Sequence, residues 1–212
     1  NLLIHCSKKA KFMVGVDQTL DSLKFVYKRL DEEKLNNTFL IQENLRNRIN
    51  LDNTFDFSII NGVLEWIPTR ISVNLNTYFN NKDKKDHDKY SNPKSDQLNF
   101  LKNVNSNLKK GGKLYLAIEN KFDYQHFLWK KDPHSGLMYT AFLPRFISNI
   151  ISKIRFGRSY VNYIYSKKEL KKLLNESGFK DIEFFATFPD YRFPKKIIPM
   201  NKNFNNKFNL FP

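Results

Sequence analysis

The chain has 212 residues, a length that suits one globular domain with insertions and that can bury a core. Hydrophobic residues make up 41% of it and aromatic residues 15%, which excludes a disordered chain. No run of about 18 apolar residues occurs, so stable membrane insertion is not expected. The single cysteine, Cys6, excludes an intrachain disulfide and favours a reducing, cytoplasmic location.

The formal net charge of +15 raises the question of a nucleic-acid partner. The lysines are spread along the whole chain, at 8–9, 82–85, 109–113, 167–172 and 195–196, and asparagine is also abundant. A general Lys/Asn composition explains such a charge, because runs of charge usually form solvated surfaces. A nucleic-acid partner is therefore kept as the less favoured alternative.

The first half of the chain reads as strands and one helix. Residues 11–17 (KFMVGVD) form a short apolar run that predicts a buried strand. Apolar residues then recur at three- and four-residue spacing behind Thr19, a good N-cap, which predicts a helix. The runs 38–42 (TFLIQ) and 55–60 (FDFSII) have the length of strands in an α/β sheet.

The second half begins with a polar segment. Residues 68–94 are rich in Asn, Lys and Asp and predict a solvated insertion. A helix follows, with Gly111 at its expected C-cap, and then a strand at 113–119. A second insertion, 121–165, contains a basic amphipathic stretch at 145–155.

The last predicted helix starts at a capping box, Ser166 to Glu169, and stops at Gly178. A strand at 181–188 follows it. This order of apolar strands and helices predicts an α/β fold with a Rossmann-like, doubly wound and mostly parallel sheet.

Each of the first four predicted strands ends on an acid or an amide. In an open α/β sheet the ligand lies beyond the carboxyl ends of the strands. A carboxylate there can accept hydrogen bonds from the hydroxyls of a ribose, and a second one can accept from an exocyclic amine. Polar residues also end strands because loops begin there, but four in succession favour a nucleoside-like ligand. These ends are Asp17, Glu43-Asn44, Asn61-Gly62 and Glu119-Asn120.

Four segments, in this order and spacing, resemble class I S-adenosylmethionine (SAM)-dependent methyltransferases: VGVD (14–17), FLIQEN (39–44), FDFSIINGVLEW (55–66) and LKKGGKLYLAIEN (108–120). LYLAIEN (114–120), DPHSGL (132–137) and FPDYRFP (188–194) further resemble a bacterial branch encoded beside glycosyltransferase and surface-polysaccharide genes. The resemblance covers nearly all of residues 1–212, as one partial methyltransferase domain with the two insertions. It departs from the family at the N-terminus, since the family's first strand and glycine-rich cofactor loop would precede Asn1. We therefore expect residues 1–212 alone to bind SAM weakly and to fold marginally.

The resemblance implies a role for each strand end. Asp17 would hold the ribose hydroxyls of SAM with Gln18 beside the adenine, and Glu43 would accept from the adenine amine with Asn44 next to it. Four residues would line the methionine and methyl-transfer region or pack over the cofactor: Asn61, Gly62, Leu64 and Glu65.

The acceptor side rests on fewer residues. Asp132 and His134 lie in the second insertion, where the family builds substrate pockets, and His134 is a candidate general base. Glu119 is the alternative base, and each of these residues also has a purely structural interpretation. The turn Pro189–Arg192 is either a rigid turn or a border of the acceptor pocket. One cysteine and four scattered histidines give no metal-ligand spacing.

The sequence thus favours a SAM-dependent methyltransferase that acts on a small-molecule or carbohydrate-linked acceptor, at a hydroxyl. An RNA methyltransferase is a second hypothesis, motivated by the charge. This chain has Asn61–Leu64 at the position where methyltransferases of nucleic-acid amino groups have a Pro-Pro-aromatic run, which disfavours that hypothesis. A third is a non-catalytic, truncated Rossmann-like module that binds a partner or an anionic membrane through residues 145–155.

Overall fold

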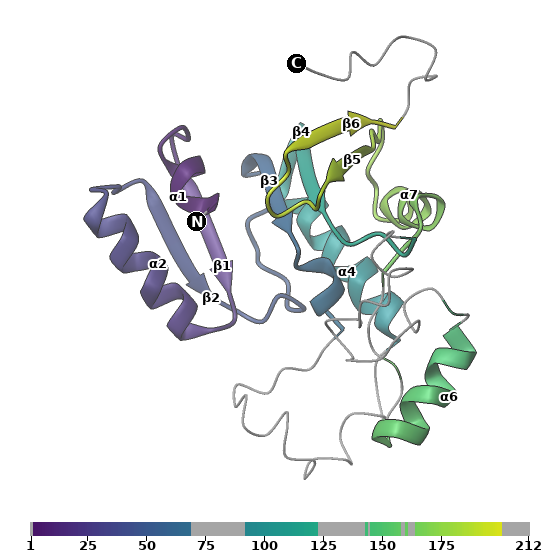
Figure 1. The fold of residues 1–212 in the computed structure, drawn as a ribbon. Coiled ribbons are helices and arrows are strands. Elements are labelled where there is room, and N and C mark those ends of the chain that lie inside the picture. Colours follow the sequence, from purple (N-terminus) through teal and green to yellow (C-terminus); the bar gives the residue numbers. More distant parts are fainter. Residues whose placement is uncertain are drawn as a thin grey trace. The chain divides into compact units, whose positions relative to one another are not determined.

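A computed structural model describes residues 2–68, 92–122, 143, 145–157, 160 and 164–200 of the protein. Its described residues divide into two compact units, the first ending at Asn50 and the second starting at Leu51. Figure 1 shows the elements of both units. Most of the predicted insertion 68–94, and residues 123–142 of the second insertion, lie outside the described residues.

The first unit is a strand–helix–strand motif preceded by a short helix. It contains α1 (Leu2–Ser7), β1 (Met13–Asp17), α2 (Leu20–Glu32) and β2 (Thr38–Gln42). β1 and β2 are parallel and pair in register from Met13↔Thr38 to Asp17↔Gln42. The two strands therefore end at the same level, which places the residues that follow them at one edge of this sheet.

The start of α2 is fixed by the residue that ends β1. The backbone N–H of Thr19 donates a hydrogen bond of 2.7 Å to Asp17 Oδ1. Thr19 is the N-cap residue, as predicted, but its own side chain makes no capping bond. Leu23 and Leu30, two turns apart, are buried, so the predicted apolar face of this helix packs inward.

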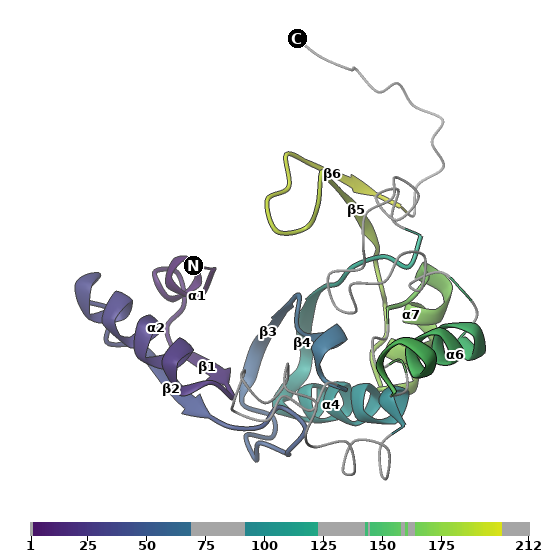
Figure 2. The same ribbon diagram turned by 60° about the horizontal axis from the view of Figure 1, so that its bottom comes forward.

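The second unit is built on a second pair of parallel strands. β3 (Phe55–Asn61) pairs with β4 (Leu108–Ala117), in register from Phe57↔Lys113 to Asn61↔Ala117. Figures 1 and 2 both show the two strands side by side. The 3-10 helix η1 (Leu64–Trp66) follows β3, and α4 (Pro93–Asn107) precedes β4. The last two residues of the predicted insertion 68–94 thus belong to a helix.

The remainder of the second unit contains two helices and a hairpin. These are α6 (Arg145–Phe156), α7 (Lys167–Glu176), β5 (Phe185–Phe188) and β6 (Lys196–Pro199). The predicted capping box of α7 is confirmed: Ser166 Oγ accepts from the N–H of Glu169, and the Glu169 carboxylate accepts from the N–H of Ser166. None of the described helices is both long and apolar enough to cross a membrane.

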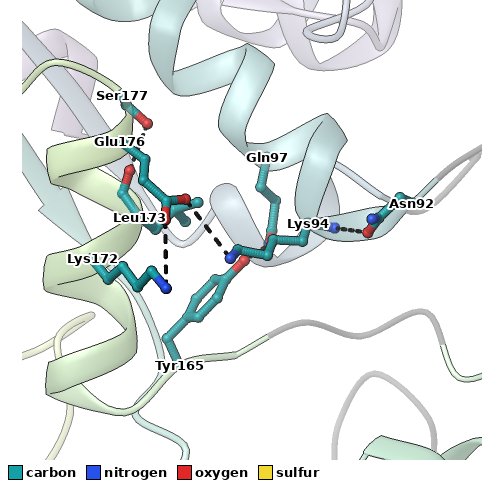
Figure 3. Close-up of polar contacts among 8 residues, drawn as sticks. All are labelled: Asn92, Lys94, Gln97, Tyr165, Lys172, Leu173, Glu176 and Ser177. Carbon is teal, nitrogen blue, oxygen red and sulfur yellow. Dashed lines mark hydrogen bonds and ion pairs between the residues drawn. The ribbon is translucent and has the colours of Figure 1, made fainter.

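A buried polar chain joins three elements of the second unit. Gln97 of α4, which is fully buried, donates from Nε2 to the carbonyl of Leu64 at 2.8 Å, and its Oε1 accepts from the hydroxyl of Tyr165. Figure 3 shows Tyr165 reaching Gln97 beside the ion pair of Lys94 and Glu176, whose Nζ and Oε2 atoms are 3.8 Å apart. α4 is thereby tied to the turn after β3 and to the segment before α7.

Two local predictions were wrong. Gly111 is not the C-cap of α4: the helix ends at Asn107, and Leu108 already pairs with Phe55 at the start of β4. The pairing of β4 with β3 thus ends the helix before the chain reaches Gly111. Gly111, with φ +83°, lies inside the strand. The last predicted strand, 181–188, forms only at Phe185–Phe188, where it pairs antiparallel with β6. The hairpin partner sets this length, since Phe185↔Pro199 is the first pair.

Candidate functional site

The first group of predicted site residues lies at the carboxyl ends of β1 and β2. The N–H of Glu43 donates to the carbonyl of Asp17 at 3.1 Å, continuing the ladder one step past Gln42. The strand register therefore holds Asp17 and Glu43 next to each other. Both side chains are half-buried, so each combines a fixed backbone with access to solvent.

One oxygen of Asp17 is engaged in the fold and the other is available. Oδ1 accepts the N–H of Thr19, whereas Oδ2 makes no hydrogen bond or ion pair with the part of the chain that the structure describes. The residue lines a cavity of about 620 Å³ formed by α1, β1, α2 and β2 within the first unit. Gly15 and Ser22 also line this cavity. A ligand hydroxyl can thus approach a carboxylate whose orientation is already set.

Glu43 and Asn44 shape the turn that follows β2. Glu43 Oε1 accepts hydrogen bonds from the N–H of Asn44 and from Asn47 Nδ2, both at 2.8 Å. Asn44 Oδ1 accepts from the N–H of Arg46 at 3.1 Å. The carbonyl of Gln18 accepts from Gln42 Nε2 at 3.4 Å, which links the residues after β1 to the end of β2. These contacts define the turn after β2, and they occupy the side-chain oxygen of Asn44.

The second group lies at the carboxyl end of β3. Asn61 is the exposed last residue of that strand, and the N–H of Gly62 donates to the carbonyl of Ala117 at 2.9 Å. Gly62 has φ +65°, a conformation in which glycine carries no steric cost. The turn directs the following residues into η1. There Leu64 is fully buried, so its side chain belongs to the core, and any contact with a ligand would come from its backbone.

The structure adds Tyr191, from the loop between β5 and β6, to this second group. Its hydroxyl donates to Oε1 of Glu65 at 3.3 Å, and Glu65 is 1% exposed. A Cβ atom on Gly62 would lie 2.6 Å from the same hydroxyl. Burial and the negative charges of Glu65 and Glu119 raise the pKa of Tyr191 well above its usual value. The phenol therefore stays protonated at neutral pH and acts as a hydrogen-bond donor.

The loop that carries Tyr191 is held by its own side chains. Asp190 Oδ1 accepts from the N–H groups of Arg192 at 2.7 Å and Phe193 at 3.3 Å. These backbone bonds outweigh partial burial and lower the pKa of Asp190. The segment Pro189–Arg192 is thus a fixed turn, and it also delivers a side chain to the end of β3. Sequence reasoning considered this segment but did not connect Tyr191 with Glu65.

The remaining candidates divide into those that are described and those that are not. Glu119 is half-buried two residues beyond β4, and its charge acts on Tyr191. His134 and Asp132 lie outside the described residues. No group of His, Cys, Asp or Glu side chains with metal-ligand geometry occurs within the described ranges. What the structure shows is therefore one group at the ends of β1 and β2 and a second group formed by Gly62, Glu65, Glu119 and Tyr191.

The amino-acid sequence matches no protein-family model and no curated protein, but solved structures are similar. A SAM-dependent methyltransferase from Methanosarcina mazei is 15% identical, with a TM-score of 0.55 over 92% of this chain and 82% of that one. A methyltransferase candidate from Bacillus halodurans has a TM-score of 0.47 and 18% identity over 82% and 57% of the two chains. The YcgJ protein of Bacillus subtilis has a TM-score of 0.46 and 13% identity over 86% and 60%.

This chain therefore spans less than two thirds of the two Bacillus proteins and most of the archaeal one. The likeness to the archaeal protein shows that the chain has the α/β, Rossmann-like fold of SAM-dependent methyltransferases. The predicted fold class is confirmed.

Proposed function

We propose that this protein is a SAM-dependent methyltransferase that acts on a hydroxyl of a small or carbohydrate-linked acceptor. The observation that carries the proposal is the carboxylate of Asp17. It stands at the carboxyl end of a parallel strand, with Oδ1 fixed by Thr19 and the residue facing an open cavity. In a fold similar to that of methyltransferases, a carboxylate in this position suits the ribose of a nucleoside.

The residues at the ends of β1 and β2 fit such a cofactor. Asp17 Oδ2 can accept a hydrogen bond from a ribose hydroxyl without breaking the bond that starts α2. Glu43 keeps a second carboxylate oxygen, beyond the Oε1 that serves the turn, for an exocyclic amine. Each charge-assisted hydrogen bond of this kind contributes roughly 1.5–3 kcal/mol. Gln18 and Asn44 would complete the nucleoside side, the latter through its amide nitrogen.

The group at the end of β3 would serve the methyl-transfer side. A bound SAM would supply a methyl group that is carried on a positively charged sulfur. As the acceptor oxygen bonds to the methyl carbon, the carbon–sulfur bond would break and its electron pair would stay on the sulfur. The proton of the acceptor hydroxyl would pass to a carboxylate or imidazole, for which Glu119 is the described candidate and His134, oriented by Asp132, the other. Asn61, Gly62 and the backbone of Leu64 would line this region, with Tyr191 and Glu65 as its wall. Positioning would supply much of the acceleration.

Binding of SAM to the full-length gene product tests the proposal. We expect measurable binding by isothermal titration calorimetry, and Asp17→Asn should weaken it by roughly 10- to 200-fold. Asparagine keeps an oxygen for the N–H of Thr19, so the start of α2 should survive. Asp31→Asn, an exposed change in the same helix, is the matched control and should leave the affinity unchanged. If Asp17→Asn binds SAM as tightly as the wild type, the cofactor does not lie at β1.

A further inference from the structure

Helix α6 exposes three of its apolar residues and buries two of its serines. Phe146, Ile150 and Ile154 are 65%, 54% and 82% exposed, whereas Ser148 and Ser152 are 1% and 4% exposed. We call the three apolar residues the α6 stripe. A surface helix of a soluble protein normally packs its apolar stripe on the core and turns its polar residues outward. The arrangement in α6 is the reverse, so packing against the part of the chain that the structure describes does not account for the stripe.

The helical geometry explains how the two faces separate. Residues two apart along a helix lie about 200° apart around its axis. Ser148 therefore points away from Phe146, and Ser152 away from Ile150. The inward side is also held by a polar contact, because Asn149 Oδ1 accepts the N–H of the buried Tyr160 at 3.1 Å. Figures 1 and 2 both draw α6 at the outer margin of the second unit.

Basic residues flank the stripe. Lys153 and Arg155, both exposed, directly precede and follow Ile154; around the helix axis Lys153 lies about 20° from Phe146, and Arg155 lies about 100° beyond Ile154 at the other edge of the stripe. The helix contains no acidic residue, and the chain carries a net charge of +15. An apolar stripe bordered by cations is the pattern of helices that lie flat in the interface of an anionic bilayer. At about 1.5 Å per residue, this helix is much too short to span one.

We propose that α6 docks the protein reversibly on an anionic lipid surface, with the α6 stripe among the acyl chains and Lys153 and Arg155 at the headgroups. This role is separate from the proposed methyl transfer. Binding to a nucleic acid depends mainly on cations that contact the phosphate backbone. It does not explain why Phe146, Ile150 and Ile154 are exposed along one side of the helix. Lipid satisfies both features of α6 at once.

Vesicle cosedimentation tests the proposal on the full-length protein. We expect binding to vesicles of phosphatidylcholine with about 30% phosphatidylserine, and much weaker binding to phosphatidylcholine alone. The double variant Phe146→Gln/Ile154→Gln should lose about tenfold or more of this binding. Both side chains are exposed, so the fold should be kept, which circular dichroism checks. The matched control, Tyr27→Gln/Phe193→Gln, alters side chains that are 67% and 82% exposed elsewhere and should bind as the wild type does.

The remaining arms separate lipid from other partners. Lys153→Gln/Arg155→Gln should weaken binding to anionic vesicles, and added salt should reduce the difference from the wild type. The proposal is overturned if the wild type ignores anionic vesicles or if the α6 stripe variant still binds them. Two other results would also overturn it. In the first, Lys153→Gln/Arg155→Gln loses binding to a short RNA but still binds anionic vesicles as the wild type does. In the second, Phe146→Gln/Ile154→Gln changes the oligomeric state in analytical ultracentrifugation.

Discussion

Replacing Gly62 by alanine probes the contact between the end of β3 and Tyr191. Gly62 has φ +65°, and an added Cβ would lie 2.6 Å from the Tyr191 hydroxyl and 3.2 Å from the nearest ring carbon. Alanine therefore brings two separable costs, a backbone in the left-handed region and a clash with the part-buried, hydrogen-bonding hydroxyl of Tyr191. Gly111 offers a control with only the first cost, since it has φ +83° and no atom within 4 Å of a Cβ.

The magnitudes follow from these two costs. A left-handed backbone costs a residue with a Cβ about 1–2 kcal/mol, which is the full expected effect of Gly111→Ala. In Gly62→Ala the Tyr191 hydroxyl must also move, and its bond to the Glu65 carboxylate is lost. A hydrogen bond to a charged group contributes about 1.5–3 kcal/mol, and a donor–acceptor distance of 3.3 Å places this one at the lower end. We expect Gly62→Ala to cost about 2.5–3.5 kcal/mol.

Equilibrium urea unfolding, monitored by circular dichroism, measures these free energies. In the background of Tyr191→Phe no hydroxyl remains to be displaced, so Gly62→Ala should then cost about 1–2 kcal/mol, close to Gly111→Ala. The coupling energy of the double-mutant cycle should be about 1.5 kcal/mol. Equal costs of Gly62→Ala in both backgrounds would refute the reasoning, because they would show that the alanine does not meet the tyrosine.

Two further predictions concern α7. Leu173→Ala should lower the free energy of unfolding by about 2–5 kcal/mol, since Leu173 is fully buried, and a shift in the urea midpoint of less than the equivalent of 1 kcal/mol would contradict its place in the core. Burial alone raises the pKa of Glu169, but hydrogen bonds from Ser166 and the charge of Lys121 outweigh it and lower the pKa below 4.5. The stabilisation is therefore complete above pH 4.5 and is lost as the pH falls through the lowered pKa. Thermal unfolding should show Glu169→Gln converging with the wild type on acidification, and a constant difference down to pH 2 would exclude this contribution.

Local patterns in the sequence predicted the elements well where a single segment determines its own structure. The run TFLIQ forms β2 with the predicted bounds, and the capping box at Ser166 starts α7 as expected. Gly111 shows the limit of such patterns. A glycine after a helical pattern usually marks its C-cap, but here the pairing of Leu108 with Phe55 ended the helix earlier. That pairing joins residues far apart in the chain, so no local signal contains it.

The same difference separates the two parts of the candidate site. Asp17 and Glu43 follow apolar runs directly, and the parallel register of β1 and β2 places them together. The contact of Tyr191 with Glu65 joins residues 126 positions apart and depends on the hairpin of β5 and β6, whose second strand was not predicted. Sequence reasoning reached the Pro189–Arg192 turn from its residues and from the resemblance of FPDYRFP (188–194), and it had no means of finding the partner of Tyr191.

Gly62, Glu65 and Tyr191 are linked by one physical requirement. Glu65 is almost fully buried, and a buried carboxylate is costly unless donors reach it. The Tyr191 hydroxyl is such a donor, but it can occupy its position only because residue 62 has no side chain. The glycine is therefore needed for the approach of the tyrosine as well as for its own turn. A larger residue at position 62 would displace the Tyr191 hydroxyl and remove this donor from Glu65. Gly62 thus has a structural role that holds whether or not a cofactor contacts it, so a loss of ligand binding in a Gly62 variant would include the cost of displacing Tyr191.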